Sequence, residues 1–382
     1  MLNNGYRYAK KAISKLYNYS LVPYGWTKSQ ICRLIPKHSA EDYPIDFVVT
    51  WVDGDDPEWQ KSKAEYEDEM IDDADNCAAR YRNSVLIRYW FRSVEQYAPW
   101  VRKIFFVTSG QKPEWLDLNH KKLVFVKHED FIPTQYLPTF NSRTIEFNLW
   151  RIKGLSEFFV YFNDDVIINN PVGPEDFYEG GLPKLCSIAV PTYYHIQRPE
   201  NVWIRNWVND IGIINDTFGI NAAVRKYPDK FFSYLYGRDL KYNWRIFEDS
   251  YITGMYYPHL AFALLKSIFA EIWDLYGEIL DDSCRYRFRN DKQVTINLPI
   301  LWMIFQGKFV PVGRGYYGKH LELTGKTITR IEEVVNSEAR IICLNDNQYT
   351  DLEDDEILKK IYDELHRSLQ AKLSERCSFE LS

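Results

Sequence analysis

Short apolar runs recur along the chain and alternate with segments that read as helices. β-branched and aromatic residues dominate four of these runs, at 45–52 (IDFVVTWV), 103–108 (KIFFVT), 123–127 (LVFVK) and 158–162 (FFVYF). Runs of this length and composition are typical of buried strands. Because charged or amphipathic helix-like stretches lie between them, the pattern predicts a parallel α/β sheet.

The second half of the chain adds elements of both kinds. Residues 187–191 predict one more strand, 260–280 a helix, and the segment from Asp351 onward a charged amphipathic helix. Neither an internal repeat nor a low-complexity linker divides the chain. We therefore expect one main body with helical inserts at 43–345, between a basic arm at 1–42 and a C-terminal helix and tail at 346–382.

Acidic residues follow the fourth apolar run. The predicted strand stops at Asn163, Asp164 and Asp165, and ligands of open α/β sheets bind beyond the carboxyl ends of the strands. Two carboxylates there can hold a cation against a phosphorylated substrate, although an ordinary capped turn is the alternative. Glu146, on a helix predicted to be capped by Ser142, can reach the same place. A third acid would repel the other two unless a cation lay between them.

A second acidic turn follows the first strand. It reads Asp53-Gly54-Asp55-Asp56-Pro57. This position is a common nucleotide site, where acids face the ribose, the base or a metal, while a tight surface turn is the structural alternative. Asp53, Gly54 and Asp56 are our candidates for the nucleotide side of a substrate.

Arginines and one histidine supply positive groups. Seven arginines form two clusters: Arg80, Arg82, Arg88 and Arg92, then Arg285, Arg287 and Arg289. Arginine forks suit phosphate, but surface ion pairs with the preceding acids are the favoured interpretation for Arg88 and Arg92. His259 precedes a predicted helix; taken alone it is a structural histidine, and beside arginines and acids it is a candidate proton acceptor.

Composition narrows the class of protein. A chain of 382 residues with 46% hydrophobic residues can bury a large core, and its net charge of −6 argues against nucleic acid as a partner. The 12 Trp, 28 Tyr and 22 Phe indicate either an aromatic core or a platform for sugar rings. The six cysteines show no metal-type spacing, and neither a signal peptide nor a membrane-spanning window is evident. We expect reduced thiols and a cytoplasmic location.

The basic arm contrasts with the acidic remainder. Residues 1–40 carry seven Lys or Arg and no acid. Aromatic and aliphatic residues interleave with the lysines, so the arm is expected to lie on an anionic membrane surface as an amphipathic helix. The alternatives are a solvated basic arm and a helix packed on the protein's own acidic body.

Four ordered blocks resemble a known family. They are IDFVVTWVDGDDPEW; RYRNSVLIRYWFRSVEQYAPWVRKIFFVTSGQKPEWL with LPTFNSRTIE and YFNDDV; NDIGIINDTFG; and YPHLAF with RYRFRND. In these blocks, and in the closing ICLND and CSFE elements, the chain resembles the Stealth family of bacterial capsular and exopolysaccharide phosphotransferases. An animal relative is the lysosomal-enzyme N-acetylglucosamine-1-phosphotransferase. The likeness runs from residue 44 almost to the end, and ordered blocks are far more specific than one motif.

The resemblance implies an activity and a fold. Enzymes of this family transfer a sugar 1-phosphate from a UDP-sugar to a hydroxyl of a glycan acceptor and release UMP. The implied fold is a mostly parallel nucleotide-sugar-binding sheet, Rossmann-like and similar to glycosyltransferase A, with helical inserts. The implied partners are a UDP-sugar and a capsular or cell-surface glycan, with peripheral contact at the inner membrane as a further expectation.

The residues that match the family's functional motifs are Glu146, Asp165, His259 and Arg289. Asp165 with Asp164 is expected to hold Mg²⁺ or Mn²⁺ on the diphosphate, because hard oxygen ligands suit these ions. Arg289 would stabilise the phosphoryl oxygens, and either His259 or Glu146 would accept the hydroxyl proton. Arg82, Asn163 and Arg287 complete the expected substrate site.

Two other functions compete with this expectation. A conventional metal-dependent glycosyltransferase would use similar acids but attack the anomeric carbon and release UDP. A glycan-binding protein with a decayed nucleotide site would bind sugar without turnover.

Overall fold

A five-stranded sheet forms the centre of the protein. In this computed structural model, which describes residues 2–34, 43–70, 76, 81–82, 85–193, 202–247, 251–316, 318–346 and 355–381, its strand order is β3-β2-β1-β4-β8. The strands are β1 (Ile45–Thr50), β2 (Ile104–Thr108), β3 (Leu123–Lys127), β4 (Phe158–Phe162) and β8 (Phe262–Leu265). The first four run parallel and β8 pairs antiparallel with β4. The predicted α/β class is therefore confirmed.

Two smaller sheets flank the central one. Both contain parallel and antiparallel pairs. The first has the order β10-β11-β5, with β5 (Val166–Ile168), β10 (Gly318–Leu323) and β11 (Ile341–Asp346). The second has the order β6-β7-β9, with β6 (Tyr178–Glu179), β7 (Leu182–Leu185) and β9 (Val310–Pro311).

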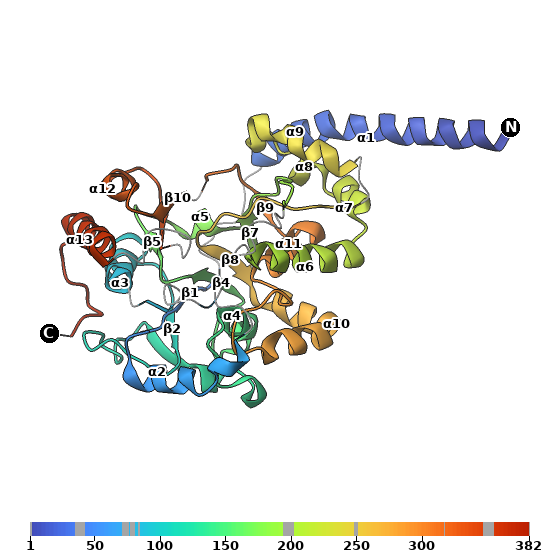
Figure 1. The fold of residues 1–382 in the computed structure, drawn as a ribbon. Helices are drawn as coiled ribbons and strands as arrows, with labels where there is room; N and C mark the ends of the chain where they lie inside the picture. The colour runs from blue at the N-terminus through green and yellow to red at the C-terminus, as the bar shows by residue number, and fades with distance from the viewer. Residues whose placement is uncertain are drawn as a thin grey trace.

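Helices cover both faces of the central sheet, as Figure 1 shows. Trp90 of α3 packs edge-on against Phe162 of β4, while Phe269 of α10 contacts Phe159 on the other side of the same strand. The alternation of side chains along a strand explains this, because residues three apart point to opposite faces. The helices are α1 (Leu2–Leu34), α2 (Pro57–Ala64), α3 (Leu86–Tyr97), α4 (Ser142–Asn148), α5 (Pro174–Phe177), α6 (Val202–Thr217), α7 (Ile220–Lys226), α8 (Pro228–Phe231), α9 (Leu240–Asn243), α10 (Lys266–Arg285), α11 (Asn297–Gln306), α12 (Ile328–Val335) and α13 (Asp355–Lys372).

Three predictions of local structure were wrong in detail. The helix expected at 260–280 begins only at Lys266, because the preceding apolar residues pair with the free edge of β4 as β8. The strand expected at 187–191 is reduced to one bridge, between Ala189 and Met255. Asn141, not Ser142, caps α4 by accepting a hydrogen bond from the Arg143 amide.

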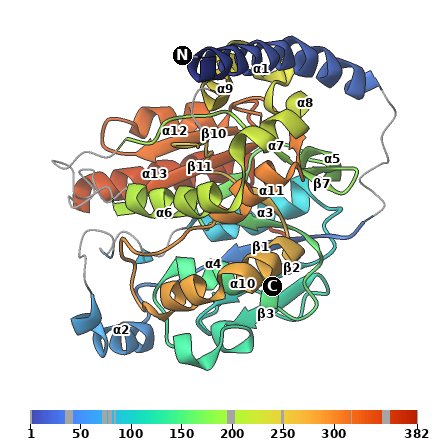
Figure 2. The ribbon, with the colours of Figure 1, turned by 90° about the vertical axis from the view of Figure 1, so that its right-hand side faces the viewer.

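Residues 2–34 of the basic arm form α1, whose C-terminal part lies beside α8 and α9 (Figure 1 and Figure 2). Leu21 and Val22 are buried, and Lys28 forms an ion pair of 2.8 Å with Asp229. The second half of the helix therefore packs on the body, as one of the predicted interpretations has it. The expectation for residues 1–12 concerns side chains outside the described part of the chain.

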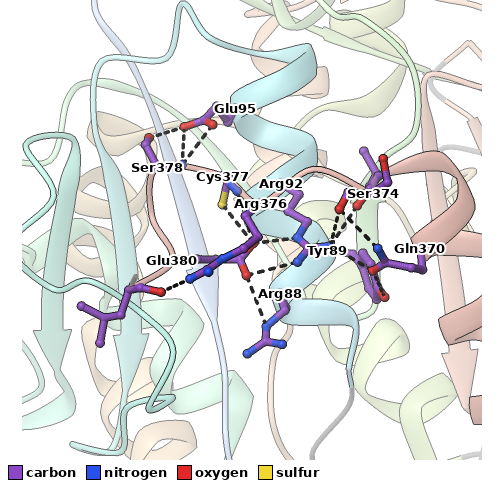
Figure 3. Close-up of polar contacts among 12 residues, drawn as sticks. Arg88, Tyr89, Arg92, Glu95, Gln370, Ser374, Arg376, Cys377, Ser378 and Glu380 are labelled. Atoms are coloured by element: carbon purple, nitrogen blue, oxygen red, sulfur yellow. Dashed lines mark hydrogen bonds and ion pairs between the residues drawn. The ribbon is translucent and has the colours of Figure 1, made fainter.

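The C-terminal tail is fixed to α3 by a buried ion pair (Figure 3). Arg92 donates through Nε and Nη2 to the two carboxylate oxygens of Glu380, at 2.6 and 3.1 Å. Arg88 lies 3.7 Å from the same carboxylate and is much more exposed. The prediction that these arginines pair with the acids before them was wrong, because the tail brings Glu380 to the helix from 288 residues away. Arg80 lies outside the described residues.

We expect Arg92→Ala to lower the free energy of unfolding by about 3 kcal/mol, because it removes both hydrogen bonds to the buried Glu380 carboxylate and leaves only the more exposed Arg88 beside that charge, at 3.7 Å. Urea unfolding followed by circular dichroism measures the loss. Arg88→Ala is the matched control and should cost less than about 1 kcal/mol, since it removes an exposed partner of the same carboxylate. Equal losses in the two variants would contradict the assignment.

Candidate active site

The acidic turn at residues 163–165 lies where two sheets meet. It links β4 of the central sheet to β5 of the β10-β11-β5 sheet. The Leu344 amide of β11 donates to the Asp165 carbonyl at 2.9 Å, and Cys343 lies opposite Val166 in the pairing of β11 with β5. The end of β11 is thereby held against the acidic turn.

A cavity of about 650 Å³ opens at this junction. The structure brings all four of the residues matched to the family's functional motifs into its wall: Glu146, Asp165, His259 and Arg289. These residues come from positions up to 143 apart in the chain, on α4, the end of β4 and two loops. Three more predicted site residues line the same cavity, namely Arg82, Asn163 and Asp164.

Two side chains of the site contact the carboxylate of Asp165. Its Oδ2 lies 3.4 Å from His259 Nε2 and accepts from Cys343 Sγ at 3.3 Å. Burial alone would raise the pKa of Asp165, but the imidazole of His259 and the thiol of Cys343 outweigh it and lower the pKa. The other oxygen, Oδ1, is buried and has no hydrogen-bond partner within the described part of the chain. One oxygen of the carboxylate, Oδ2, thus contacts two side chains, whereas the other, Oδ1, can accept a further ligand.

Asp164 and Asp346 add negative charge beside Asp165. Burial, together with the carboxylates of Asp165 and Asp346, raises the pKa of Asp164 to about 7. Arg82, a predicted phosphate ligand, is paired with a carboxylate: its Nη1 donates to Asp346 Oδ2 at 2.5 Å. Asp346 was not among the predicted site residues. The sequence pattern that identifies Asp164 and Asp165 also occurs at Asp346. The apolar run IICL is followed by Asn345 and Asp346, just as the run FFVYF is followed by the acidic turn at 163–165.

The raised pKa of Asp164 predicts a pH effect on stability. The folded protein holds this proton up to about pH 7, whereas an unfolded chain releases it at about pH 4. Ionisation between these values favours the unfolded state, so stability falls as pH rises through this range. In EDTA, Asp164→Asn should lose about 2 kcal/mol less stability than the parent protein between pH 5 and pH 7. Urea titrations at several pH values test this, and parallel curves would contradict it.

Glu146 sits beneath the cavity on α4. Its side chain is almost fully buried, and the Tyr161 hydroxyl donates to Oε1 at 3.2 Å. Burial raises the pKa of Glu146, and the Arg289 guanidinium opposes that shift. Glu146 therefore holds a proton more readily than an exposed glutamate does.

Arg289 is held in place through its backbone and its side chain. Its amide donates to Asn76 Oδ1, its carbonyl accepts from Asn76 Nδ2, both at 3.0 Å, and Nη2 donates to Ser142 Oγ at 2.7 Å. Because Ser142 is the first residue of α4, the guanidinium and Glu146 belong to one local unit.

Four predicted substrate-binding residues are not among the described residues that line the cavity: Asp53, Gly54, Asp56 and Arg287. Asp56 caps α2 through the Trp59 amide, and the Asp53 carbonyl accepts from Gln111. Gly54 approaches the Tyr81 carbonyl so closely that a Cβ would lie 2.1 Å from its oxygen. Arg287 pairs with Glu69 at 3.0 Å, outside the cavity. The structure gives these residues structural contacts, and their role in substrate binding stays a prediction.

Two further side chains reach the site without having been predicted. Cys343 donates to Asp165, and His320 of β10 lies with its ring centroid 5.7 Å from that of His259. The β10–β11 register, which sets His320 opposite Cys343, accounts for both. No local pattern indicates either residue, because their approach depends on strand pairing.

The oxygen atoms of this cluster fit a hard divalent cation. Asp165 Oδ1 is buried without a partner in the described residues, and Asp164 and Asp346 bring like charge beside it. Asp165, His259 and Cys343 could also hold a softer metal together, since their donor atoms lie within 4.8 Å of one another. Cys343, however, donates its proton to Asp165, and burial with Asp165 raises its thiol pKa well above the ordinary value. Carboxylate oxygens are the better available ligands, and they are those that Mg²⁺ prefers.

Fold and site together define a class of protein. Carboxylates, an imidazole and a guanidinium converge beyond the carboxyl end of a mostly parallel sheet, which is the arrangement of an α/β enzyme with acid–base and anion-binding groups. Family comparison then makes the assignment specific. Residues 43–71 match the Stealth protein conserved region 1, and residues 80–184 match the Stealth protein conserved region 2.

Similar proteins extend this match over most of the chain. The capsular polysaccharide phosphotransferase WcwK of Streptococcus pneumoniae is 41% identical over 343 residues, covering 88% of this chain and 98% of the relative. The receptor polysaccharide phosphotransferase WefC of Streptococcus oralis is 35% identical, covering 88% and 99%. The exopolysaccharide phosphotransferase cps2G of Lactiplantibacillus plantarum is 32% identical, covering 88% and 96%. The chain belongs to the Stealth family.

Proposed function

We propose that this protein is a polysaccharide phosphotransferase that moves a hexose 1-phosphate from a UDP-sugar to a glycan hydroxyl and releases UMP. The phosphotransferase role in capsular or exopolysaccharide synthesis rests on the names of its relatives. The observation that carries the finer proposal is the convergence of Glu146, Asp165, His259 and Arg289 on one cavity. These groups supply the base, the cation site and the anion-stabilising cation that phosphoryl transfer needs.

The nucleotide is proposed to occupy the side of the cavity formed by the first three strands. Thr50 and Trp51 at the end of β1, Ser109 after β2 and His128 after β3 all line it. In Rossmann-like sheets this edge receives nucleotides. The four parallel strands support a nucleotide-sugar-binding sheet of the glycosyltransferase A kind as part of the proposal.

In the proposed reaction the acceptor oxygen attacks the β-phosphorus of the donor. A new P–O bond forms, the bond from the β-phosphorus to the bridging oxygen breaks, and UMP leaves with that electron pair. The hydroxyl proton passes to the imidazole of His259, which Asp165 orients through the 3.4 Å contact. Arg289 stabilises the charge that develops on the phosphoryl oxygens. Glu146 stays the alternative base.

Asp165 and Asp164, with Asp346 beside them, would hold Mg²⁺ or Mn²⁺. When bound, such an ion neutralises diphosphate charge and aligns the leaving group. Because Asp165 already uses Oδ2 for His259 and Cys343, Oδ1 is the oxygen left for the cation.

We expect Asp165→Asn to raise the Mg²⁺ concentration needed for half-maximal activity by about tenfold or more, because the amide removes a charged oxygen ligand. Activity titrated with Mg²⁺, Mn²⁺ and Zn²⁺ after EDTA treatment measures this. A variant that folds normally and keeps the same metal dependence would overturn the assignment of Asp165 as a ligand.

Product analysis tests the function directly. Purified protein is incubated with a panel of UDP-sugars and short glycans, and nucleotides and glycans are identified by mass. UMP together with an acid-labile phosphodiester supports the proposal, whereas UDP indicates a conventional glycosyltransferase. Glycan binding by calorimetry without binding of any UDP-sugar would indicate a noncatalytic glycan-binding protein.

The site of action is proposed to be the cytoplasmic face of the inner membrane. Within the described residues, no helix is both long and apolar enough to span a bilayer. Ile13, Leu16 and Tyr17 of α1 are exposed around Lys15, which supports contact with an anionic surface. Co-sedimentation of the full chain with vesicles containing phosphatidylglycerol, but not with phosphatidylcholine vesicles, would support this contact, and equal recovery with both would count against it.

A further inference from the structure

Two tryptophans form one wall of the cavity away from the acidic turn. Trp203 and Trp207 project from successive turns of α6, both line the cavity and both are half-buried. Their ring centroids are 4.7 Å apart and their planes meet at 70°. Two indoles at this angle make a corner with two apolar faces. Such faces are suited to the C–H side of a pyranose ring.

This corner is joined directly to the proposed reaction centre. Trp207 packs on Tyr257 with ring centroids 5.0 Å apart, and Tyr257 lies two residues before His259. Tyr257 also stacks on Phe262 of β8, which belongs to the central sheet. Ring contacts therefore run from Trp203 to Tyr257, two residues before His259 in the chain.

The helix that carries the tryptophans is clamped to the loop that carries Arg289. Asn206 donates to the carbonyls of Asn290 and Gln293 at 2.8 and 3.0 Å. Buried Asp210 accepts from the amide and the hydroxyl of Thr295 at 2.9 and 2.6 Å. Because the same loop positions Arg289, the two indoles keep a fixed place relative to the guanidinium. A substrate group bound at this corner is held in register with the reacting phosphate.

The chemistry of this end of the cavity differs from that of its centre. His259 is its titratable base, and the other lining residues from segments 203–207, 256–260 and 295–296 carry no charge: Trp203, Trp207, Tyr256, Tyr257, Pro258, Leu260, Thr295 and Ile296. The charged lining residues come from other segments, including Asp164, Asp165 and Asp346 around the acidic turn, Arg143 and Glu146 of α4, and Arg289 beside Ser142. A neutral saccharide fits an uncharged aromatic wall, whereas a diphosphate requires the charged centre.

We propose that Trp203 and Trp207 form the binding platform for the acceptor glycan, with one sugar ring stacked in the corner and its attacking hydroxyl directed toward His259. This assignment rests on the proposed function, which places the nucleotide at the ends of β1, β2 and β3. The acceptor then enters from the opposite end of the cavity, and the two substrates meet at Asp165 and Arg289.

The probe is a defined glycan preparation from the organism that carries the gene. Mild acid followed by phosphatase converts its surface polysaccharide into phosphate-free repeat oligosaccharides, because sugar 1-phosphate linkages are acid-labile. Calorimetry with the full chain measures the Kd of these oligosaccharides and, separately, of UDP. The same preparations are used as acceptors to obtain KM values for oligosaccharide and UDP-sugar.

We expect Trp203→Ala and Trp207→Ala each to raise the oligosaccharide Kd and KM about tenfold or more, since a buried tryptophan contact commonly contributes over 1 kcal/mol. The Kd of UDP and the KM of the UDP-sugar should change less than about twofold. Trp203→Phe and Trp207→Phe should keep most of the affinity because they keep an aromatic face. Trp26→Ala is the control, because it removes an exposed tryptophan of α1 outside the cavity. It should change neither the Kd nor the KM of either substrate.

Three results would overturn the platform. The first is an oligosaccharide Kd that is unchanged in both alanine variants. The second is a rise in the KM of the UDP-sugar with no rise in the KM of the oligosaccharide. The third is a parent protein that turns over UDP-sugar but has no measurable affinity for the oligosaccharides. Failure of the proposed function has a different signature, namely a parent protein that neither binds UDP nor forms UMP.

Discussion

Replacing Arg289 with alanine is expected to lower kcat by about 10³- to 10⁵-fold, the range found for arginines that stabilise a transferring phosphoryl group. The guanidinium lines the cavity and is directed by Ser142 at 2.7 Å, while Asn76 fixes the backbone through two hydrogen bonds. Because the backbone contacts do not involve the side chain, the variant should fold normally. Steady-state turnover of UDP-sugar to UMP, with circular dichroism as the folding check, measures the effect.

Arg285→Ala is the matched control for this substitution. Arg285 is an exposed arginine four residues earlier that pairs with Asp281 at 2.8 Å, so its loss should change kcat less than about threefold. Arg289→Lys should recover only part of the rate, since lysine keeps the charge but lacks the planar fork. Near-parent turnover in a well-folded Arg289→Ala variant would remove this residue from the chemistry.

Replacing His259 with alanine is expected to lower kcat by about 10²- to 10⁴-fold, the usual contribution of a general base. The KM of the UDP-sugar should change little, because the imidazole contacts Asp165 rather than the proposed nucleotide edge. Added imidazole should restore part of the rate by entering the space left in the cavity. Rate measurements over a range of imidazole concentrations test this.

The same measurement separates the two candidate bases. If His259 accepts the proton, Glu146→Gln keeps a larger share of the parent rate than His259→Ala does, and added formate does not restore the rate of Glu146→Ala. Rescue of Glu146→Ala by formate, with His259→Ala unaffected by imidazole, would assign the base to Glu146. The burial that raises the pKa of Glu146 makes this second outcome chemically reasonable.

Local patterns were sufficient for most strands of the central sheet. The apolar runs at 123–127 and 158–162 became β3 and β4 with the predicted bounds. β4 is buried along almost its whole length, and a strand buried on both faces reads as a continuous apolar run. β3 is a partly buried edge strand, and its β-branched and aromatic residues gave the signal there. The strand at residues 262–265 was not predicted, because so short an apolar run directly before the helical pattern of α10 does not distinguish a strand from the start of that helix. Only the free edge of β4 decided that they form a strand.

The residues of the candidate site likewise fall into those that the sequence predicted and those that only the structure revealed. Acidic residues at a strand end identified Asp164 and Asp165, and the ordered family blocks identified Glu146, His259 and Arg289. Neither source gave the contacts of Asp165 with Cys343, the charge that Asp346 adds, or the separation of Asp53 and Arg287 from the cavity wall.

The sequence by itself determined the α/β class, the position of the acidic turn and the family to which the chain belongs. The tertiary structure alone decided which polar groups surround that turn and which tryptophans share its cavity. The physical reason is that a strand or a turn follows from the preferences of neighbouring residues, whereas the pairing of β11 with β5 and the clamping of α6 depend on contacts between distant segments. Such contacts form only when the whole chain has folded.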